Sequence, residues 1–333
     1  MNTSIYVNYP EKSPCCYSTI QAAIDSIPDD NTEAVTVYVA KGVYRERLII
    51  RKPYVTLQGE DADTTVIVYG HYALEPHPDG RNRGTFRSYS MLVDTHDFTG
   101  KNLTIANDAG TGKVVGQALA LYMDGDRCAL YHCRLLGSQD TLFTGPLPEK
   151  EMQAGGFVGP KEFAPRVNGR QYYQDCYIQG DVDYVFGSAT AYFSNCEFFT
   201  KNRFADMPND NPQEAQDRCY GYVTAASTYE KQEYGYILDH CRFTSDCPAN
   251  TVYLGRPWRQ YAQTILLHCE LGAHIKTEGW MDWKKPHETI RYAEFESFGP
   301  GAAPDKRADF SSQLSAKEAA HFAKEKVLGD WAV

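Results

Sequence analysis

Short runs of β-branched and aromatic residues recur in the first part of the chain, separated by glycines and polar residues. They read VTVYVA (35–40), RLIIR (47–51), YVTLQG (54–59) and TVIVYG (65–70). Runs of this length and composition, bounded by Gly, Asn and Asp, are typical of β-strands. The pattern therefore predicts a chain built mainly from short strands.

Helical periodicity is strong only near the two ends of the chain. In IQAAIDSI (20–27) the apolar residues follow the i, i+3, i+4, i+7 spacing, and Ser18 or Thr19 is a candidate N-cap. This pattern predicts a helix over about 18–28.

Near the C-terminal end, Ser315 and Glu318 have the spacing of a capping box and open the helical sequence KEAAHFAKEKVL. We expect a second helix over about 315–327. Because a stack of strands needs its terminal edges covered, both helices are expected to act as caps.

Five segments share one pattern, in which His, Asp or Asn precedes a cysteine and a short apolar strand follows. The cysteines lie 43, 20, 45 and 28 residues apart, and a period of about 20 residues is the short end of those that form solenoids. Longer steps fit one coil plus an inserted loop. The segments are YHCRLLG (131–137), QDCYIQG (174–180), SNCEFFT (194–200), DHCRFTS (239–245) and LHCELGA (267–273), with GKNLTIAN (100–107) and ADTTVIVYG (62–70) as further coils without cysteine.

The repeat predicts an all-β fold, a right-handed parallel β-helix that forms a single domain over residues 1–333. A β-sandwich is the alternative, although a sandwich does not require such repetition. The stretch 145–169 is rich in Gly and Pro and is expected to leave the coil as a long loop.

One apolar, strand-like run, QGDVDYVFGSA (179–189), carries two aspartates. Alignment of two repeats from their cysteines gives the pattern C-x3-G-x2-D-x2-F in both, so Asp140 and Asp183 hold the same position in their coils. With the loop at 145–169 set aside, these coils become neighbours. Matching positions in adjacent parallel strands lie about 4.8 Å apart.

Two carboxylates at that separation do not both ionise easily, so the pKa of one is expected to rise while that of the other stays low. The pair then supplies one carboxylate nucleophile or base and one carboxylic acid. Because like-charge pairs of this kind cluster at active sites, Asp140 and Asp183 are candidate catalytic residues.

Charge and composition bear on the possible partners. Lys and Arg number 33 against 43 Asp and Glu, a net charge of −10, so the chain has no basic surplus for nucleic acid. The sequence contains no run of eighteen apolar residues, so a membrane span is not expected.

The first residues, MNTSIYVNYPEKSPCCYS, lack the features of a signal peptide, which leads us to expect a cytoplasmic protein. We also expect a monomer.

The ten cysteines recur mostly inside strand-like segments, which predicts buried free thiols and agrees with a reducing compartment. Three repeats contain a His-Cys pair, but no CxxC or HxxxH spacing accompanies them. We therefore expect no metal site and no cofactor.

At these motifs the sequence resembles the pectin methylesterases, carbohydrate esterases with a parallel β-helix fold. The resemblance covers roughly the whole chain in family order. Its specific motifs are QALAL (117–121), GSQDTLF (137–143), GDVDYVFG (180–187) and LGRPWR (254–259).

The resemblance implies a role for each matching residue. Asp183 is similar to the nucleophile, and Asp140 to the general acid that protonates departing methanol and then acts as a base on water. Arg256 resembles the arginine that holds the nucleophile, and Gln139 and Gln117 resemble the amides that stabilise the oxyanion. The residues that the resemblance assigns to the substrate groove are Trp258, Phe186, Phe143, Val182 and Trp283.

The implied activity is hydrolysis of the methyl esters of galacturonate residues in pectin or methylated oligogalacturonides, with release of methanol. A cytoplasmic esterase would act on imported oligomers. Asp181, Tyr184 and Phe143 stand where the family often has Thr, Phe and Tyr, which bears on the subsites. The stretch 145–169 is longer than in compact members, and we expect it to wall one end of the groove and favour short oligomers.

Two other classes of function remain open. A β-helical glycosidase or lyase of the same polymer would also use acidic residues, although the QDT and GRPW motifs speak against it. A non-catalytic carbohydrate-binding solenoid would not need Asp140 and Asp183 together.

Overall fold

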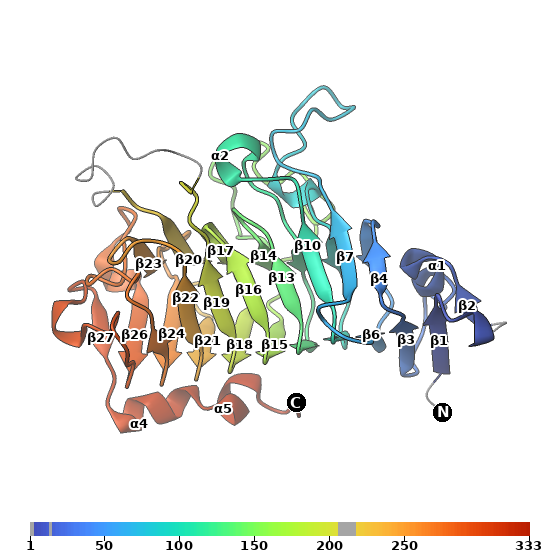
Figure 1. Cartoon of the computed structure of the whole chain (residues 1–333). Helices are drawn as coiled ribbons and strands as arrows, with labels where there is room; N and C mark the ends of the chain where they lie inside the picture. The colour runs from blue at the N-terminus through green and yellow to red at the C-terminus, as the bar shows by residue number, and fades with distance from the viewer. Residues whose placement is uncertain (1–2, 13–14, 206–217) are drawn as a thin grey trace.

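The computed structural model describes residues 3–12, 15–205 and 218–333, which wind through three parallel sheets (Figure 1). Most coils contribute one strand to each sheet in turn, so that a strand pairs with the strand three places later in the chain. We call the sheets A, B and C.

Sheet A has twelve strands, in the order β2 (Cys16–Tyr17), β1 (Thr3–Val7), β3 (Val35–Val39), β6 (Val55–Gly59), β9 (Thr99–Lys101), β12 (Cys128–Tyr131), β15 (Arg170–Gln174), β18 (Thr190–Ser194), β21 (Tyr236–Asp239), β24 (Gln263–Leu267), β26 (Arg291–Phe295) and β27 (Ser311–Gln313). Sheet B has eight, in the order β25 (Glu270–Leu271), β22 (Arg242–Ser245), β19 (Glu197–Thr200), β16 (Tyr177–Gly180), β13 (Arg134–Leu136), β10 (Thr104–Asn107), β7 (Thr65–Tyr69) and β4 (Gly42–Tyr44). Sheet C has seven, in the order β23 (Val252–Gly255), β20 (Gly221–Ala226), β17 (Val182–Gly187), β14 (Leu142–Thr144), β11 (Leu121–Met123), β8 (Met91–Val93) and β5 (Leu48–Ile50).

Helices are short and few among the described residues. The α-helices are α1 (Ile20–Asp25), α2 (Gly112–Val115), α4 (Ala316–Ala319) and α5 (Lys324–Leu328). The 3-10 turns are η1 (Pro10–Lys12), η2 (Thr85–Arg87), η3 (His287–Thr289), η4 (Pro304–Lys306) and η5 (Ala320–Phe322). None of these helices is long and apolar enough to cross a membrane.

The predicted parallel β-helix is confirmed, together with helices near both ends. Thr19 caps α1 by accepting a hydrogen bond from the Ala22 N–H, and the helix buries its apolar side against the first coils. The capping box of Ser315 and Glu318 opens α4, but the helix expected over about 315–327 is divided into α4, η5 and α5, because the backbone of Ala323 leaves the helical conformation with a ψ of 143°. α4 and α5 run beneath sheet A in Figure 1, so they cover a side of the solenoid and not its last coil.

The helix α2 lies outside the predicted helical ends. It has only four residues, and Gly116, at a φ of 74°, ends it. A single turn of this length leaves no periodic signal in the sequence.

The cysteine repeat fills the interior of the coils. Cys133, Cys176, Cys196, Cys241 and Cys269 are all buried, and all ten cysteines of the chain carry free thiols. The S–H group of each of the five repeat cysteines donates to a backbone carbonyl, for example Cys196 to Tyr173 at 3.4 Å. A small thiol therefore satisfies its own polar group while it packs in the core.

The polar residue before each cysteine marks the turn from sheet A to sheet B. Asn102, which precedes Leu103 in a coil without cysteine, and Glu296 hold the same place, and all these residues have φ between 51° and 53°. Asn, Asp and His tolerate this left-handed conformation better than most residues, which explains the repeat. We call this column the turn ladder; it consists of Asn102, His132, Asp175, Asn195, His240, His268 and Glu296.

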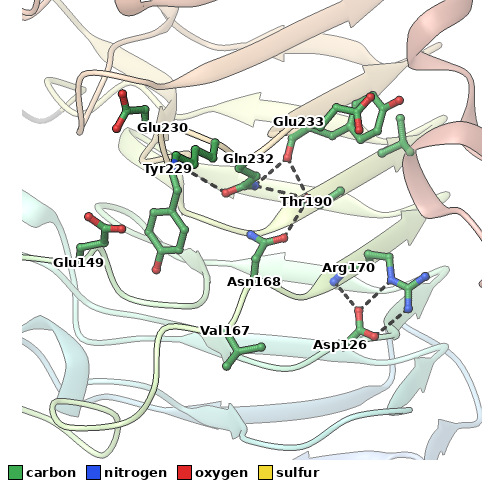
Figure 2. Close-up of a pocket in the computed structure, with 13 residues that line it drawn as sticks. Asp126, Glu149, Val167, Asn168, Arg170, Thr190, Tyr229, Glu230, Gln232 and Glu233 are labelled. Carbon is green, nitrogen blue, oxygen red and sulfur yellow. Dashed lines mark hydrogen bonds and ion pairs between the residues drawn. The ribbon is translucent and has the colours of Figure 1, made fainter.

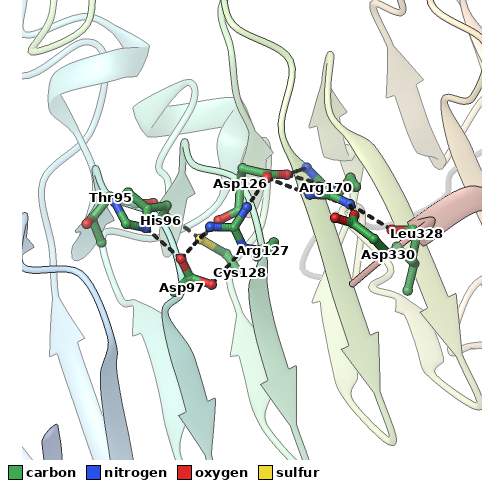
Figure 3. Close-up of polar contacts among 9 residues, drawn as sticks. All are labelled: Thr95, His96, Asp97, Asp126, Arg127, Cys128, Arg170, Leu328 and Asp330. Carbon is green, nitrogen blue, oxygen red and sulfur yellow. Dashed lines mark hydrogen bonds and ion pairs between the residues drawn. The ribbon is translucent and has the colours of Figure 1, made fainter. Parts of the chain in front are cut away.

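At the corner between sheets C and A, charged side chains of alternating sign link successive coils (Figure 3). Arg127 lies between Asp97 and Asp126, with contacts of 2.6 and 2.9 Å, and Arg170 lies between Asp126 and Asp330, at 2.8 and 2.6 Å. We call these five residues the corner ion ladder. Arg170 also donates to the carbonyl of Leu328, which fastens α5 to the coils.

The stretch 145–169 lies between β14 and β15 and contains no helix or strand. Lys161 anchors it to sheet C through Asp94 at 2.5 Å and Asp124 at 3.6 Å. Arg166 donates to four carbonyls of the loop itself, those of Pro148, Lys161, Glu162 and Ala164. These contacts give the loop a defined path over the coils.

Candidate active site

Asp140 and Asp183 occupy matching positions on adjacent coils, as their motifs predict. In the β14–β17 pair Leu142 lies opposite Val185, so the register places the two aspartates opposite each other two residues earlier. The Asp140 N–H donates to the Val182 carbonyl at 3.0 Å.

A β-bulge accounts for a carboxylate in this apolar strand. Between β17 and β20 the register advances by three residues, from Val182 to Val185, on one strand and by two, from Tyr222 to Thr224, on the other. Asp183 lies at this irregularity with a φ of 50°. A bulge re-aims a side chain, and the carboxylate of Asp183 therefore reaches the pocket outside sheet C while its neighbours keep their strand positions.

Arg256 binds Asp183 through a two-pronged contact. Its Nε and Nη2 donate to the two carboxylate oxygens at 2.8 and 2.7 Å. The guanidinium is held between the rings of Tyr222 and Trp283, 3.9 and 3.8 Å from their centroids. This sandwich fixes the plane of the guanidinium and hence the orientation of the Asp183 carboxylate.

The two aspartates differ in charge state. Burial raises the pKa of Asp140 well above its usual range, and the negative charge of Asp183 raises it further. Burial also raises the pKa of Asp183, but the hydrogen bonds and charge of Arg256 oppose that rise. Because Arg256 binds only Asp183, the geometry favours an ionised Asp183 beside a protonated Asp140.

Gln117 and Gln139 line the same pocket as the two aspartates. They sit on adjacent coils, since the Ala118 N–H donates to the Gln139 carbonyl at 3.1 Å. Gly112 of α2 packs directly on Gln139: a Cβ at this glycine would lie 2.6 Å from the Gln139 Cβ. The otherwise unpredicted α2 therefore positions one of the two amides.

An aromatic wall borders the pocket, whose volume is about 370 Å³. Trp258 packs against Phe186 with a centroid distance of 5.5 Å, and against Phe86 and Phe157 at 6.5 and 6.4 Å. Trp283 lies on the pocket as well, above the Arg256 guanidinium. These rings supply the apolar surface on which a sugar ring packs.

Two residues expected in the groove, Phe143 and Val182, do not line this pocket. Phe143 faces outward from sheet C but is fully buried, because Phe86 of η2 packs over it at 5.0 Å. Val182 is also buried, and its carbonyl holds the Asp140 N–H. Both residues support the pocket from beneath.

Asp181 and Tyr184, which differ from the common family residues, also do not line the pocket. The Asp181 carboxylate is buried and accepts the Val182 N–H at 2.6 Å. Tyr184 points into the coil interior, where its hydroxyl pairs with Thr200 at 3.1 Å. Neither residue therefore sets a subsite in this pocket.

Several pocket residues were missed by the sequence interpretation. The long loop contributes Met152, Gln153, Gly156 and Phe157, and Phe86 comes from the segment before β8. Loop residues carry no coil periodicity that would place them. Arg259 also lines the pocket and stacks on Trp258 at 4.6 Å, and its place in LGRPWR was a signal that could have found it.

A larger hollow of about 930 Å³ lies at the corner between sheets C and A (Figure 2). Its polar groups pair with one another: Thr190 donates to Asn168 at 3.0 Å, and Asp126 binds Arg170. It contains no matched carboxylate pair comparable to Asp140 and Asp183, so the smaller pocket is the candidate active site.

Comparison with known proteins identifies the family of this chain. A family model described as Pectinesterase matches residues 8–147 and 166–330. The chain is 31% identical over 331 residues to Pectinesterase 31 of Arabidopsis thaliana, covering 97% of this chain and 92% of the relative. The internal stretch that this family model leaves unmatched, 148–165, falls inside the long loop.

Solved structures show the same fold. Pectin methylesterase PemA from Erwinia chrysanthemi has a TM-score of 0.80 at 29% identity, covering 100% of this chain and 98% of that one. The pectin methylesterase from Yersinia enterocolitica has a TM-score of 0.78 at 31% identity, covering 95% and 100%. The fold is thus the right-handed parallel β-helix of these enzymes, and the chain belongs to the pectinesterase family of carboxylic ester hydrolases.

Proposed function

We propose that this protein hydrolyses methyl esters of galacturonate residues in pectin or in methylated oligogalacturonides, with Asp183 as nucleophile and Asp140 as general acid and base. The observation that carries the proposal is the pair of buried carboxylates on adjacent coils, of which only Asp183 is bound by Arg256. A similar structure, at a TM-score of 0.80, is a pectin methylesterase in complex with a hexasaccharide, which supports a pectic oligosaccharide as substrate.

In the first step the Asp183 carboxylate attacks the ester carbonyl carbon, and the side-chain amides of Gln117 and Gln139 donate to the developing oxyanion. The tetrahedral intermediate collapses as Asp140 gives its proton to the departing methoxide. Methanol leaves, an acyl anhydride joins the substrate to Asp183, and Asp140 is left ionised.

In the second step Asp140 takes a proton from water, whose oxygen attacks the substrate carbon of the anhydride. The bond to Asp183 breaks, which restores the Asp183 carboxylate and the Asp140 acid. The product uronic acid ionises and releases one proton to solvent for each methanol formed. Methanol release and acidification therefore report the same reaction.

The family match favours this reaction over a depolymerase or a non-catalytic binding solenoid. The test is methanol release from methylated oligogalacturonides, with reducing ends and unsaturated products followed in parallel. Wild type should release methanol without new ends, and Asp183→Ala should lower the rate by about 10³-fold or more.

Asp175→Asn is the matched control, because Asp175 has the same left-handed φ in the same coil but lies in the turn ladder, away from the pocket. It should keep wild-type methanol release. New chain ends without methanol would show that the protein is a depolymerase and that the paired aspartates cleave the chain. Unchanged methanol release in Asp183→Ala would exclude Asp183 as the nucleophile.

We infer that short oligomers are the preferred substrates, because the long loop contributes Met152 and Phe157 to the pocket wall. The rate of methanol release should then fall with increasing oligomer length for wild type. It should become independent of length when residues 150–158 are replaced by a short Gly-Ser linker.

The cytoplasmic location and the monomeric state stay predictions, which cell fractionation and sedimentation analysis check.

A further inference from the structure

Two adjacent imidazoles and a carboxylate meet on the turn ladder, at the corner between sheets A and B. Asp239 lies opposite Leu267 in the β21–β24 pair, so His240 and His268 follow at matching positions on neighbouring coils. Their rings stack with centroids 4.7 Å apart. Oδ1 of Asp239 lies 2.7 Å from Nδ1 of His240 and 3.5 Å from Nδ1 of His268.

Neighbouring polar groups hold two members of this cluster in place. The Tyr192 hydroxyl donates to Oδ2 of Asp239 at 2.9 Å, which leaves Oδ1 to face the imidazoles. Nε2 of His268 lies 3.6 Å from Oε2 of Glu296, the next residue of the turn ladder. A small shift would let Glu296 accept from this nitrogen, and a carboxylate on the outer nitrogen of a histidine is the usual support of a metal ligand.

We propose that Asp239, His240 and His268 bind a divalent transition-metal ion, with zinc as the type case. Their ligand atoms all lie within 4.8 Å of one another, and imidazole with carboxylate is a donor set that zinc, nickel and copper accept. Donors that share one zinc ion at about 2.1 Å lie about 3.4 Å apart, so small side-chain rotations bring this group into range. Solvent supplies the fourth position, since His240 is largely exposed.

This site is separate from the catalytic pocket. The aspartate pair acts outside sheet C, whereas the cluster lies at the corner between sheets A and B, next to a hollow of about 490 Å³ that α4 and α5 border. A bound ion would join the coil of β21 to the coil of β24. We therefore expect it to stabilise the C-terminal coils without taking part in ester hydrolysis.

The sequence interpretation expected no metal because the three His-Cys pairs showed no recognised ligand spacing. His132 illustrates that reasoning. Its neighbours in the turn ladder are Asn102 and Asp175, the latter at 3.7 Å, and no second imidazole faces it among the described residues. Only the coil register, which stacks His240 on His268, reveals a second imidazole.

The test is titration of tag-free protein with zinc by calorimetry and with cobalt by its visible absorption, in a Cys15→Ser background that removes the exposed thiol. His240→Asn and His268→Asn are the test variants, because Asn195 already occupies this turn in another coil. His132→Asn is the matched control. We expect about one equivalent of metal in wild type and control, and affinity lowered at least about tenfold in both test variants.

A zinc-dependent rise in melting temperature should accompany binding in wild type and control and be absent in His268→Asn, whose own melting temperature without metal reports its folding. Equal metal affinity in all four proteins would overturn the proposal, as would a zinc-dependent rise in melting temperature that persists in His268→Asn.

Discussion

The corner ion ladder and the proposed catalytic pair, Asp140 and Asp183, are both formed by the stacking of coils, but the stacking has opposite electrostatic results at the two places. In the corner ion ladder each guanidinium lies between two carboxylates, and hydrogen bonds from the arginines help hold the pKa values of Asp97 and Asp126 below their usual range although burial opposes this. In the pocket two carboxylates are neighbours and a single arginine binds one of them. The first arrangement stabilises ionised groups, and the second keeps a proton on Asp140.

The two places differ in the order of positive and negative side chains along the stack and in how deeply these side chains are buried. Side chains at the corner are partly exposed, so water screens their interactions, and their like charges are interleaved with opposite ones. Asp140 and Asp183 are each less than 10% exposed. A parallel β-helix brings matching positions of neighbouring coils together wherever it stacks, and the residue types at those positions decide whether the result is a structural or a reactive site.

Among the changes that test this comparison, replacement of the protonated Asp140 should have the largest effect. Asp140→Asn keeps the size of the side chain but has no acid proton to give to methoxide, and general acid catalysis typically contributes about 10²–10⁴-fold. The kcat for methanol release should fall by that amount while the protein stays folded by circular dichroism. Retention of more than half the wild-type kcat would show that another group protonates the leaving methoxide.

Replacement of Arg256, the arginine of the pocket, should have the next largest effect. Arg256→Lys keeps a positive charge but loses the two-pronged contact, and should lower kcat by about 10²-fold, since a hydrogen bond to a charged group contributes about 1.5–3 kcal/mol. The pKa of Asp183 should rise, because its main opposing cation is misplaced.

Asp183 must be ionised to attack, so the acidic limb of the pH–rate profile should move to higher pH in Arg256→Lys. A lower kcat with an unmoved acidic limb would limit Arg256 to orienting the nucleophile.

A break in the corner ion ladder should affect stability and not activity. Asp126→Asn removes the carboxylate that both Arg127 and Arg170 contact, and should lower the free energy of unfolding by roughly 1–2 kcal/mol at neutral pH, because networks of partly buried pairs exceed the small value of isolated ones. Urea unfolding measures the loss.

The folded-state pKa of Asp126 is lowered, so its contribution is present above the ordinary pKa near 3.8 and disappears as the pH falls through the lower folded value. The stability difference between Asp126→Asn and wild type should therefore vanish in acid. A difference that persists unchanged at low pH would point to packing as its cause.

The smallest effect is expected for the stability of Asp140→Asn in acid, because its difference from wild type develops only as the pH rises. The folded-state pKa of Asp140 is raised, so its stabilising contribution is full below the ordinary pKa and is lost as the pH rises through the folded value. The variant should match wild-type stability only below the ordinary pKa, where Asp140 is protonated in both the folded and the unfolded chain, and should exceed it increasingly as the pH rises toward the folded value. The two variants would then have opposite dependences on pH, and parallel pH curves in urea unfolding would contradict the assigned protonation states.

The coil-based features of this molecule could be predicted from sequence because they repeat. C-x3-G-x2-D-x2-F fixed the register of Asp140 and Asp183, and the polar residue before each cysteine marks a left-handed turn. Features built by loops could not be predicted in this way. The packing of Phe86 over Phe143 and the approach of Phe157 to the pocket depend on paths that coil periodicity does not specify.

Because each strand pairs with the next coil, the residues of the site come together in a fixed order during synthesis. Arg256 follows Asp183 by 73 residues, so both aspartates leave the ribosome well before their arginine. Coils of a solenoid can dock one after another as they emerge. Until the coil that ends in Arg256 has docked, the nascent chain lacks the arginine that binds Asp183, so the proposed nucleophile cannot be held in its final orientation before that step.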